Sequence, residues 1–368
     1  MMRHGLTVAA ALMCGQSALA QESGDASLRA ALTVLPAEVF APTHSDLTSF
    51  LDLSLLAELH SGRLDRPAFQ RGQAVSGLRP VDALAMAGPE EWSMAAGTDI
   101  ANLRFVAGYG QPPNQVAIWG FSDEAAASDA FAGLTERGFS PFGTLPGVVA
   151  NGEPGQMDMS ARNPADPWRG MLGKSSFVTQ RGAIFLHADL PDAFAPILGA
   201  ASSAEASPTG AALLAGLEAQ EGVTVQAMLF GPSLGLHSGI DPSVLMTATP
   251  DKAIAAIEEA MTAPVPGVPL YSGAILADLQ GAGGPVMVLA LAYSDCATAE
   301  AAAAQAAALW SESAPDIGAA VPSHVDAGAS GCAAVISVAG DGEVNAPFDR
   351  AVRGIFQRDL LPIRVSME

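Results

Sequence analysis

The pattern that most constrains the fold is a pair of strands followed by a helix with an aspartate as its N-cap. Residues 103–109 alternate between faces like a strand, a turn-rich loop follows, and residues 115–121 form a second apolar run. Asp123 then precedes a helical stretch, and Gly138 ends it. These residues predict a β-hairpin with a helix that packs back on it.

The same pattern returns in the second half of the chain. Strands are predicted over 270–279 and 285–293, and Asp295 begins an alanine-rich helix that runs to about Trp310. The triplet Phe121-Ser122-Asp123 matches Tyr293-Ser294-Asp295 at a spacing of 172 residues. This match favours an internal duplication, and two independent occurrences of a common strand-to-helix junction are the alternative.

Each pattern continues with a further strand and helix, which is the element order of small α+β sandwiches. We therefore predict an α+β fold of two related units, each a β-hairpin–helix–strand–helix with an antiparallel sheet and helices on one face. An irregular helical extension, with an amphipathic helix over 46–59, precedes them. The predicted segments are 1–20 (signal peptide), 21–100 (extension), 101–220 (first unit) and 221–368 (second unit).

The first twenty residues are typical of a removable signal peptide. Arg3 supplies a positive charge, residues 6–13 are apolar, and Ala18-Leu19-Ala20 fits a cleavage site after Ala20. A lipid-modified Cys14 is an alternative that its preceding residues support poorly. No later segment has the length of a membrane span, so we expect a soluble periplasmic protein.

Cleavage would leave two cysteines, Cys296 and Cys332. Two cysteines in an oxidising compartment usually pair, and neither a C-x-x-C motif nor a histidine at ligand spacing suggests redox or metal chemistry. The sequence predicts a structural disulfide between the second unit's helix and the strand after it.

The charge of the chain excludes nucleic-acid binding. The net charge is −21, and loss of Arg3 with the signal peptide makes it −22. With only two lysines, Lys174 and Lys252, no basic patch can be assembled locally. The excess of acidic residues is best explained by a requirement for solubility, and attraction of a cationic partner or metal ions is the alternative explanation.

The most suggestive catalytic pattern is Gly231-Pro232-Ser233-Leu234-Gly235, which has the G-x-S-x-G spacing of a nucleophile elbow. The pattern is weak, because a chance match is not rare in a chain with 38 glycines, and because residues 236–242 are expected to form a loop where a nucleophile elbow continues into a helix. Only His237 and His324 follow it as potential bases. Ser233 is therefore a weak catalytic candidate.

The remaining motifs predict no cofactor and no metal. Asp341-Gly342-Glu343-Val344-Asn345 resembles the start of a calcium loop but lacks its later ligands, so a turn with Asn345 as helix cap explains it better. His187 is interpreted as a satisfied residue at a strand end, and Trp168 as the core anchor of a loop.

We therefore expect a protein that acts by binding or scaffolding, with a protein or small-molecule partner that the sequence does not identify. One alternative is a serine hydrolase using Ser233, which a deep pocket and a nearby histidine would favour. Another is an assembly or maturation factor for an envelope complex, which an exposed apolar sheet face would favour.

Overall fold

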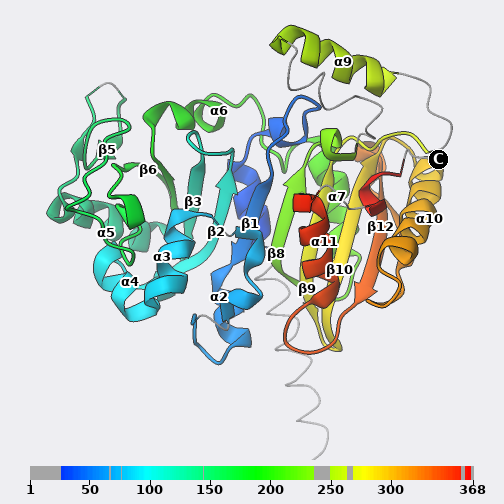
Figure 1. Cartoon of the computed structure of the whole chain (residues 1–368), viewed down its shortest axis with the longest axis horizontal. Coiled ribbons are helices and arrows are strands. Elements are labelled where there is room, and N and C mark those ends of the chain that lie inside the picture. The colour runs from blue at the N-terminus through cyan, green and yellow to red at the C-terminus, as the bar shows by residue number, and fades with distance from the viewer. Residues whose placement is uncertain are drawn as a thin grey trace, which may run out of the picture.

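A computed structural model describes residues 26–65, 68–75, 77–143, 145–235, 249–262, 268–357 and 361–365. Within them, strands from both halves of the chain pair into one antiparallel sheet of 12 strands, in the order β11-β12-β10-β9-β8-β1-β2-β3-β7-β6-β5-β4 (Figure 1). The predicted α+β class is confirmed. The predicted signal peptide and Cys14 lie outside the described residues.

The elements have the following bounds. The strands are β1 Thr48–Asp52, β2 Leu103–Tyr109, β3 Val116–Phe121, β4 Ser140–Pro141, β5 Val148–Ala150, β6 Phe177–Arg181, β7 Ile184–Ala188, β8 Val223–Phe230, β9 Ala274–Gly281, β10 Gly284–Tyr293, β11 Val321–Asp326 and β12 Cys332–Ala339. The helices are a first one over 26–34, then α2 Leu53–Leu59, α3 Arg79–Ala87, α4 Pro89–Ala96, α5 Glu124–Gly133, α6 Ala195–Leu198, α7 Pro208–Glu218, α9 Pro250–Thr262, α10 Cys296–Ser313 and α11 Ala346–Gln357. None of these described helices has the length and apolar composition that crossing a bilayer requires.

Both predicted hairpin–helix units form as the capping residues indicate. The Asp123 carboxylate accepts a hydrogen bond from the Ala126 N–H at 2.8 Å and begins α5. Asp295 accepts from the Thr298 N–H at 2.8 Å and begins α10. Each cap satisfies a backbone donor that the helix itself leaves unpaired, which explains why the helix begins there.

The expectation that helices cover one face of the sheet is wrong, because they cover both. On one face, the helix over 26–34 and α7 pack on strands of both halves as a single apolar cluster. On the other, α2–α5 cover β1–β3 and β7, and α10 and α11 cover β9, β10 and β12 (Figure 1). The sequence carries the reason: residues 286–293 are apolar without alternation, which is typical of strands buried on both faces.

The predicted helix over 46–59 is wrong in its first half. Residues Thr48–Asp52 form β1, which is buried throughout and pairs with β2 on one side and β8 on the other. The helix begins only at Leu53, where the Asp52 side chain accepts from the Leu55 N–H at 2.8 Å. Pairing with two distant strands outweighs the local helical spacing. β1 therefore joins the strands of the two halves into one sheet.

Candidate functional site

Ser233, the weak catalytic candidate, lies in a short 3-10 helix, Pro232–Gly235, directly after β8. Its hydroxyl is half-buried and donates to the backbone carbonyl of His44 at 3.1 Å. Pro232 lines a cavity of about 510 Å³, and no histidine is among the described residues around it. These contacts give Ser233 a backbone partner rather than a base.

The histidines predicted as partners of Ser233 do not come near it in the described residues. His324 is exposed on β11, and β12, β10 and β9 separate that strand from β8. Four strand spacings correspond to roughly 19 Å. His237 lies outside the described residues.

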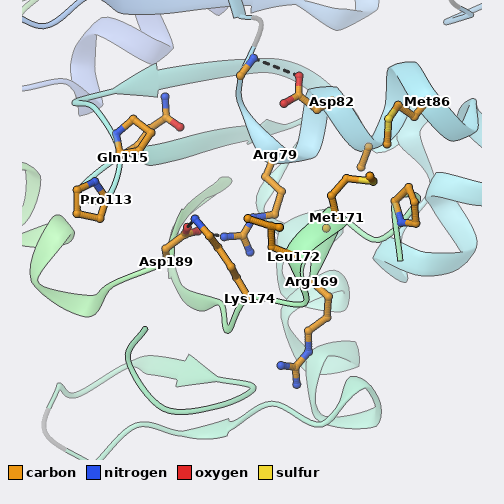
Figure 2. Close-up of a pocket in the computed structure, with 15 residues that line it drawn as sticks. Arg79, Asp82, Met86, Pro113, Gln115, Arg169, Met171, Leu172, Lys174 and Asp189 are labelled. Carbon is orange, nitrogen blue, oxygen red and sulfur yellow. Dashed lines mark hydrogen bonds and ion pairs between the residues drawn. The ribbon is translucent and has the colours of Figure 1, made fainter. Parts of the chain in front are cut away.

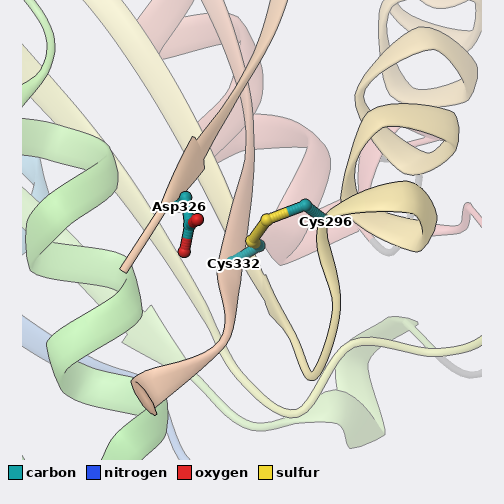
Figure 3. A group of neighbouring side chains, drawn as sticks. All are labelled: Cys296, Asp326 and Cys332. Carbon is teal, nitrogen blue, oxygen red and sulfur yellow. A yellow bond between two sulfur atoms is a disulfide. The ribbon is translucent and has the colours of Figure 1, made fainter. Parts of the chain in front are cut away.

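The predicted disulfide is present between Cys296, the first residue of α10, and Cys332, the first residue of β12. Their Cα atoms are 5.1 Å apart, within the usual range for a disulfide. Figure 3 shows Asp326 of β11 beside the bridge, and its carboxylate lies within 4.8 Å of both sulfurs. Because the sulfurs are bonded to each other, they are not thiolate ligands, and the group is a helix-to-sheet cross-link.

The turn over Asp341–Asn345 has the role that the sequence favours. The Asn345 side-chain oxygen accepts from the Phe348 N–H at 3.2 Å, as a helix cap does. Its amide donates to Asp278 at 2.7 Å, and Asp278 is completely buried. Asn345 therefore joins the start of α11 to β9.

A group of charged side chains that the sequence did not single out is the best candidate site. Asp189, just after β7, is ion-paired with Arg79 at the start of α3 and with Lys174, whose Nζ lies 2.8 Å from its Oδ2. The side chains of Arg79, Lys174 and Asp189 are 17%, 31% and 27% exposed. One carboxylate is thus shared by two cations, which leaves the trio with a net charge of +1.

Burial is the main influence on both cations. Burial lowers the pKa of Arg79 to about 10, with Asp166 opposing the shift and the nearby Arg169 adding to it. Burial, and then the charge of Arg79, lower the pKa of Lys174. An anion placed beside Lys174 would reverse part of that shift, because it would favour the ammonium form.

Beneath the ion pairs, a buried polar cluster surrounds Ser176. Its Oγ accepts from Arg79 Nη1 at 2.8 Å, donates to the Trp168 carbonyl, and lies 2.8 Å from His187 Nε2. Ser176 is fully inaccessible to solvent. Its hydroxyl proton is donated to a carbonyl, so the Ser176–His187 contact is structural and not that of a nucleophile with its base.

His187 lies near the end of its strand, as the sequence indicates, but its ring is not fully satisfied. It lies on β7, an interior strand, where burial and then Arg79 lower its pKa well below the usual value. Its Nδ1, the Trp119 Nε1 and the Asn151 Nδ2 are buried with no hydrogen-bond partner in the described residues. Three incompletely satisfied groups in one place are unusual in a packed interior and more typical of a functional region.

The loop between β5 and β6, residues 151–176, carries Lys174 and forms one wall of the site. Trp168, as predicted, anchors it in the core: the ring is 2% exposed and stacks on Trp119 at 4.6 Å. Gly173 has a positive φ of 60°, and a Cβ there would lie 1.9 Å from the Asp158 carbonyl oxygen. Only glycine fits this turn, which fixes the position of Lys174.

The loop and α3 enclose a space of about 220 Å³, which we call the α3 cavity. It is lined by Gly77, Arg79, Asp82, Ala83, Met86, Pro112, Pro113, Gln115, Pro164, Arg169, Gly170, Met171, Leu172, Lys174 and Asp189. Figure 2 shows Arg79 and Lys174 converging on Asp189, whereas Arg169 extends away toward the loop, where it donates to the Asn151 carbonyl at 2.6 Å. The second carboxylate, Asp82, accepts from the Gly77 N–H at 3.1 Å, and burial raises its pKa.

Sequence reasoning missed this site because its residues come from three separate parts of the chain. Arg79, Lys174 and Asp189 belong to a helix, a loop and a strand end, and no local pattern connects them. The rarity of lysine was the one available signal, since one of only two lysines follows Gly173 in the loop that Trp168 anchors.

Comparison of this chain with protein-family models, with curated proteins and with solved structures finds no match.

Proposed function

We propose that the mature chain is exported to the periplasm and acts by binding an anionic ligand in the α3 cavity. The observation that carries the proposal is the sharing of Asp189 between Arg79 and Lys174. The trio is net positive although the chain as a whole has a net charge of −21, and the partial burial of the trio strengthens its attraction for an anion.

The donors needed for an anion are available. The Lys174 ammonium has three N–H groups, and its contact with Asp189 uses one of them. Arg79 is held rigidly by the Trp168 carbonyl at 2.6 Å and by Ser176, so its charge is already positioned before a ligand arrives. Preorganisation of this kind reduces the entropic cost of binding.

The two other interpretations of the sequence have less support. A hydrolase using Ser233 requires a histidine ring as its base, whereas the Ser233 hydroxyl donates to the backbone carbonyl of His44 and not to its ring. Labelling by a fluorophosphonate probe that is lost in Ser233→Ala would contradict our proposal. An assembly factor was expected to expose an apolar sheet face, and helices cover both faces of the described sheet.

The two-unit architecture belongs to the same proposal. Outward from the β1–β8 pair, the order β1-β2-β3-β7-β6 corresponds to β8-β9-β10-β12-β11. Both halves contain a helix, a strand, a hairpin, a capped helix and a final pair of strands in the same order, and the first half has α2–α4 and the strands β4 and β5 in addition. This correspondence supports a duplication, with the second copy beginning near α7 rather than at residue 221.

The test uses the fact that the chain has two lysines. The mature protein is treated with a limiting amine-reactive ester, and modification of Lys174 and Lys252 is quantified by mass spectrometry, with and without acetate or phosphate at constant ionic strength. A bound anion should slow the reaction of Lys174, because it favours the unreactive ammonium form and blocks access. Lys252, on α9, is the internal control; equal rates with and without anion would contradict the proposal.

A further inference from the structure

The α3 cavity has an apolar rim beside its cations. Met86, Met171 and Leu172 line it, and they are 55%, 58% and 47% exposed. Large apolar side chains that stay exposed beside a cavity commonly mark a binding surface. Methionine is suited to such a surface, because its unbranched chain adapts to the shape of a flexible apolar partner.

We propose that the ligand is an amphipathic anion, with an anionic head at Arg79 and Lys174 and an unbranched apolar chain along Met86, Met171 and Leu172. This inference rests on the proposed function and adds the class of ligand to it. In Figure 2, Met86 and Met171 lie on the far side of Arg79 from Pro113 and Gln115, and Leu172 lies close to the Arg79 head group, so the apolar side chains lie beside the cations.

The size of the cavity fits a short chain. About 220 Å³ corresponds to roughly seven water-sized groups. A carboxylate and several methylenes fill this volume, and a longer chain would continue over the exposed rim. Hexanoate is therefore a suitable probe, and pentyl phosphate presents the same alkyl chain with a different anionic head.

Burial of the chain should increase affinity steeply. Each buried methylene raises the binding constant about fourfold. Hexanoate has four more methylenes than acetate, so burial of half of them should make protection of Lys174 at least about tenfold stronger. The neutral 1-hexanol and the cationic hexyltrimethylammonium carry an alkyl chain one carbon longer than that of hexanoate and no anion, and they should protect Lys174 little.

Two exposed positions allow the rim to be changed without disturbing the core. Met86→Ser and Met171→Ser should bring hexanoate protection close to that of acetate. Met94→Ser is the matched control, because Met94 is 67% exposed on α4 and does not line the cavity. Thermal midpoints of the three variants verify that each remains folded.

The outcomes separate this inference from the proposed function. If acetate and hexanoate protect Lys174 equally at the same concentration, the amphipathic ligand is overturned but the anion site stays in place. Equal protection by hexanol and hexanoate would also overturn it, because the head would then not matter. Protection by none of the anions would contradict the proposed function itself. A comparison of hexanoate with pentyl phosphate identifies which head the site prefers.

Discussion

At the scale of single residues, Arg71 and Asp278 form a buried ion pair that attaches the segment before α3 to the second half of the sheet. Arg71 Nε and Nη2 each donate to Asp278 at 2.8 Å, and the two residues are 3% and 0% exposed. Gln226 and Asn345 also donate to the Asp278 carboxylate, so each of its two oxygens accepts two hydrogen bonds. Such a pair contributes little net stability while intact, but its disruption leaves a buried charge.

We therefore expect Arg71→Ala to lower the free energy of unfolding by about 3–5 kcal/mol in urea titrations. Arg71→Ala/Asp278→Asn should recover part of the loss, because the uncompensated charge is removed. Arg63→Ala is the control: Arg63 is 72% exposed and lies 3.7 Å from Asp65, and exposed pairs contribute at most about 1 kcal/mol. Similar losses in Arg71→Ala and Arg63→Ala would contradict this assignment.

His187 gives the chain a specific dependence of stability on pH. Its folded-state pKa is lowered by burial and by Arg79, so the unfolded state takes up the proton first as the pH falls. The stability that neutral His187 contributes is present above the unfolded pKa of about 6.5 and is lost below it. Its other neighbours, Ser176, Trp119 and Trp168, carry no charge that offsets this effect.

His187→Gln should therefore reduce the loss of thermal midpoint between pH 7 and pH 5, since glutamine can donate to Ser176 and does not titrate. The comparison is with the wild-type chain and with His324→Gln, which changes an exposed histidine on β11. A wild-type chain and a His187→Gln variant with parallel pH profiles would show that His187 is not buried in its neutral form.

At the scale of elements, the sequence predicts those whose signals are local. Strand β2 has the predicted bounds, β3 begins one residue after its predicted start, and α10 begins directly after the predicted cap Asp295. Several strands escape prediction, and for β1 and β11 the physical reason is clear. β1 carries helical spacing and becomes a strand by pairing with residues more than fifty positions away, such as Val106 and Gln226. β11, an exposed edge strand with Pro322, lacks the apolar alternation that identifies a strand.

The disulfide gives a prediction for α10 and β12. It closes a separation of 36 residues, which in the chain-entropy model stabilises the fold by roughly 3–4 kcal/mol. For a chain of this size that corresponds to a decrease of about 5 °C in thermal midpoint on reduction. Cys296→Ser/Cys332→Ser should match the reduced wild-type chain in circular dichroism and calorimetry. An unchanged midpoint would mean that native strain cancels the entropic gain.

At the scale of the whole molecule, the sheet face beneath the first helix and α7 unites the two halves. A single apolar cluster contains Leu32 of the first helix, Ile118 of β3, Leu213 of α7, Val288 of β10 and Val335 of β12. β1 and β8 pair directly, from Thr48 opposite Leu229 to Leu51 opposite Gln226. Either half alone would therefore expose a wide apolar surface, so we expect the halves to unfold as one unit.

Hydrogen exchange of the reduced protein tests this cooperativity. If the halves unfold together, loss of the disulfide should raise exchange of the slowest amides of β7 and β12 by the same factor, about 10²–10³. Ile118→Val in β3 places the perturbation in the first half instead. It removes one methylene from a fully buried side chain and should speed exchange in β12 as much as in β7. A rise confined to β8–β12 after reduction, or to β2–β7 in Ile118→Val, would mean that each half has its own cooperative core. The β1–β8 pair would then be a domain boundary within a continuous sheet.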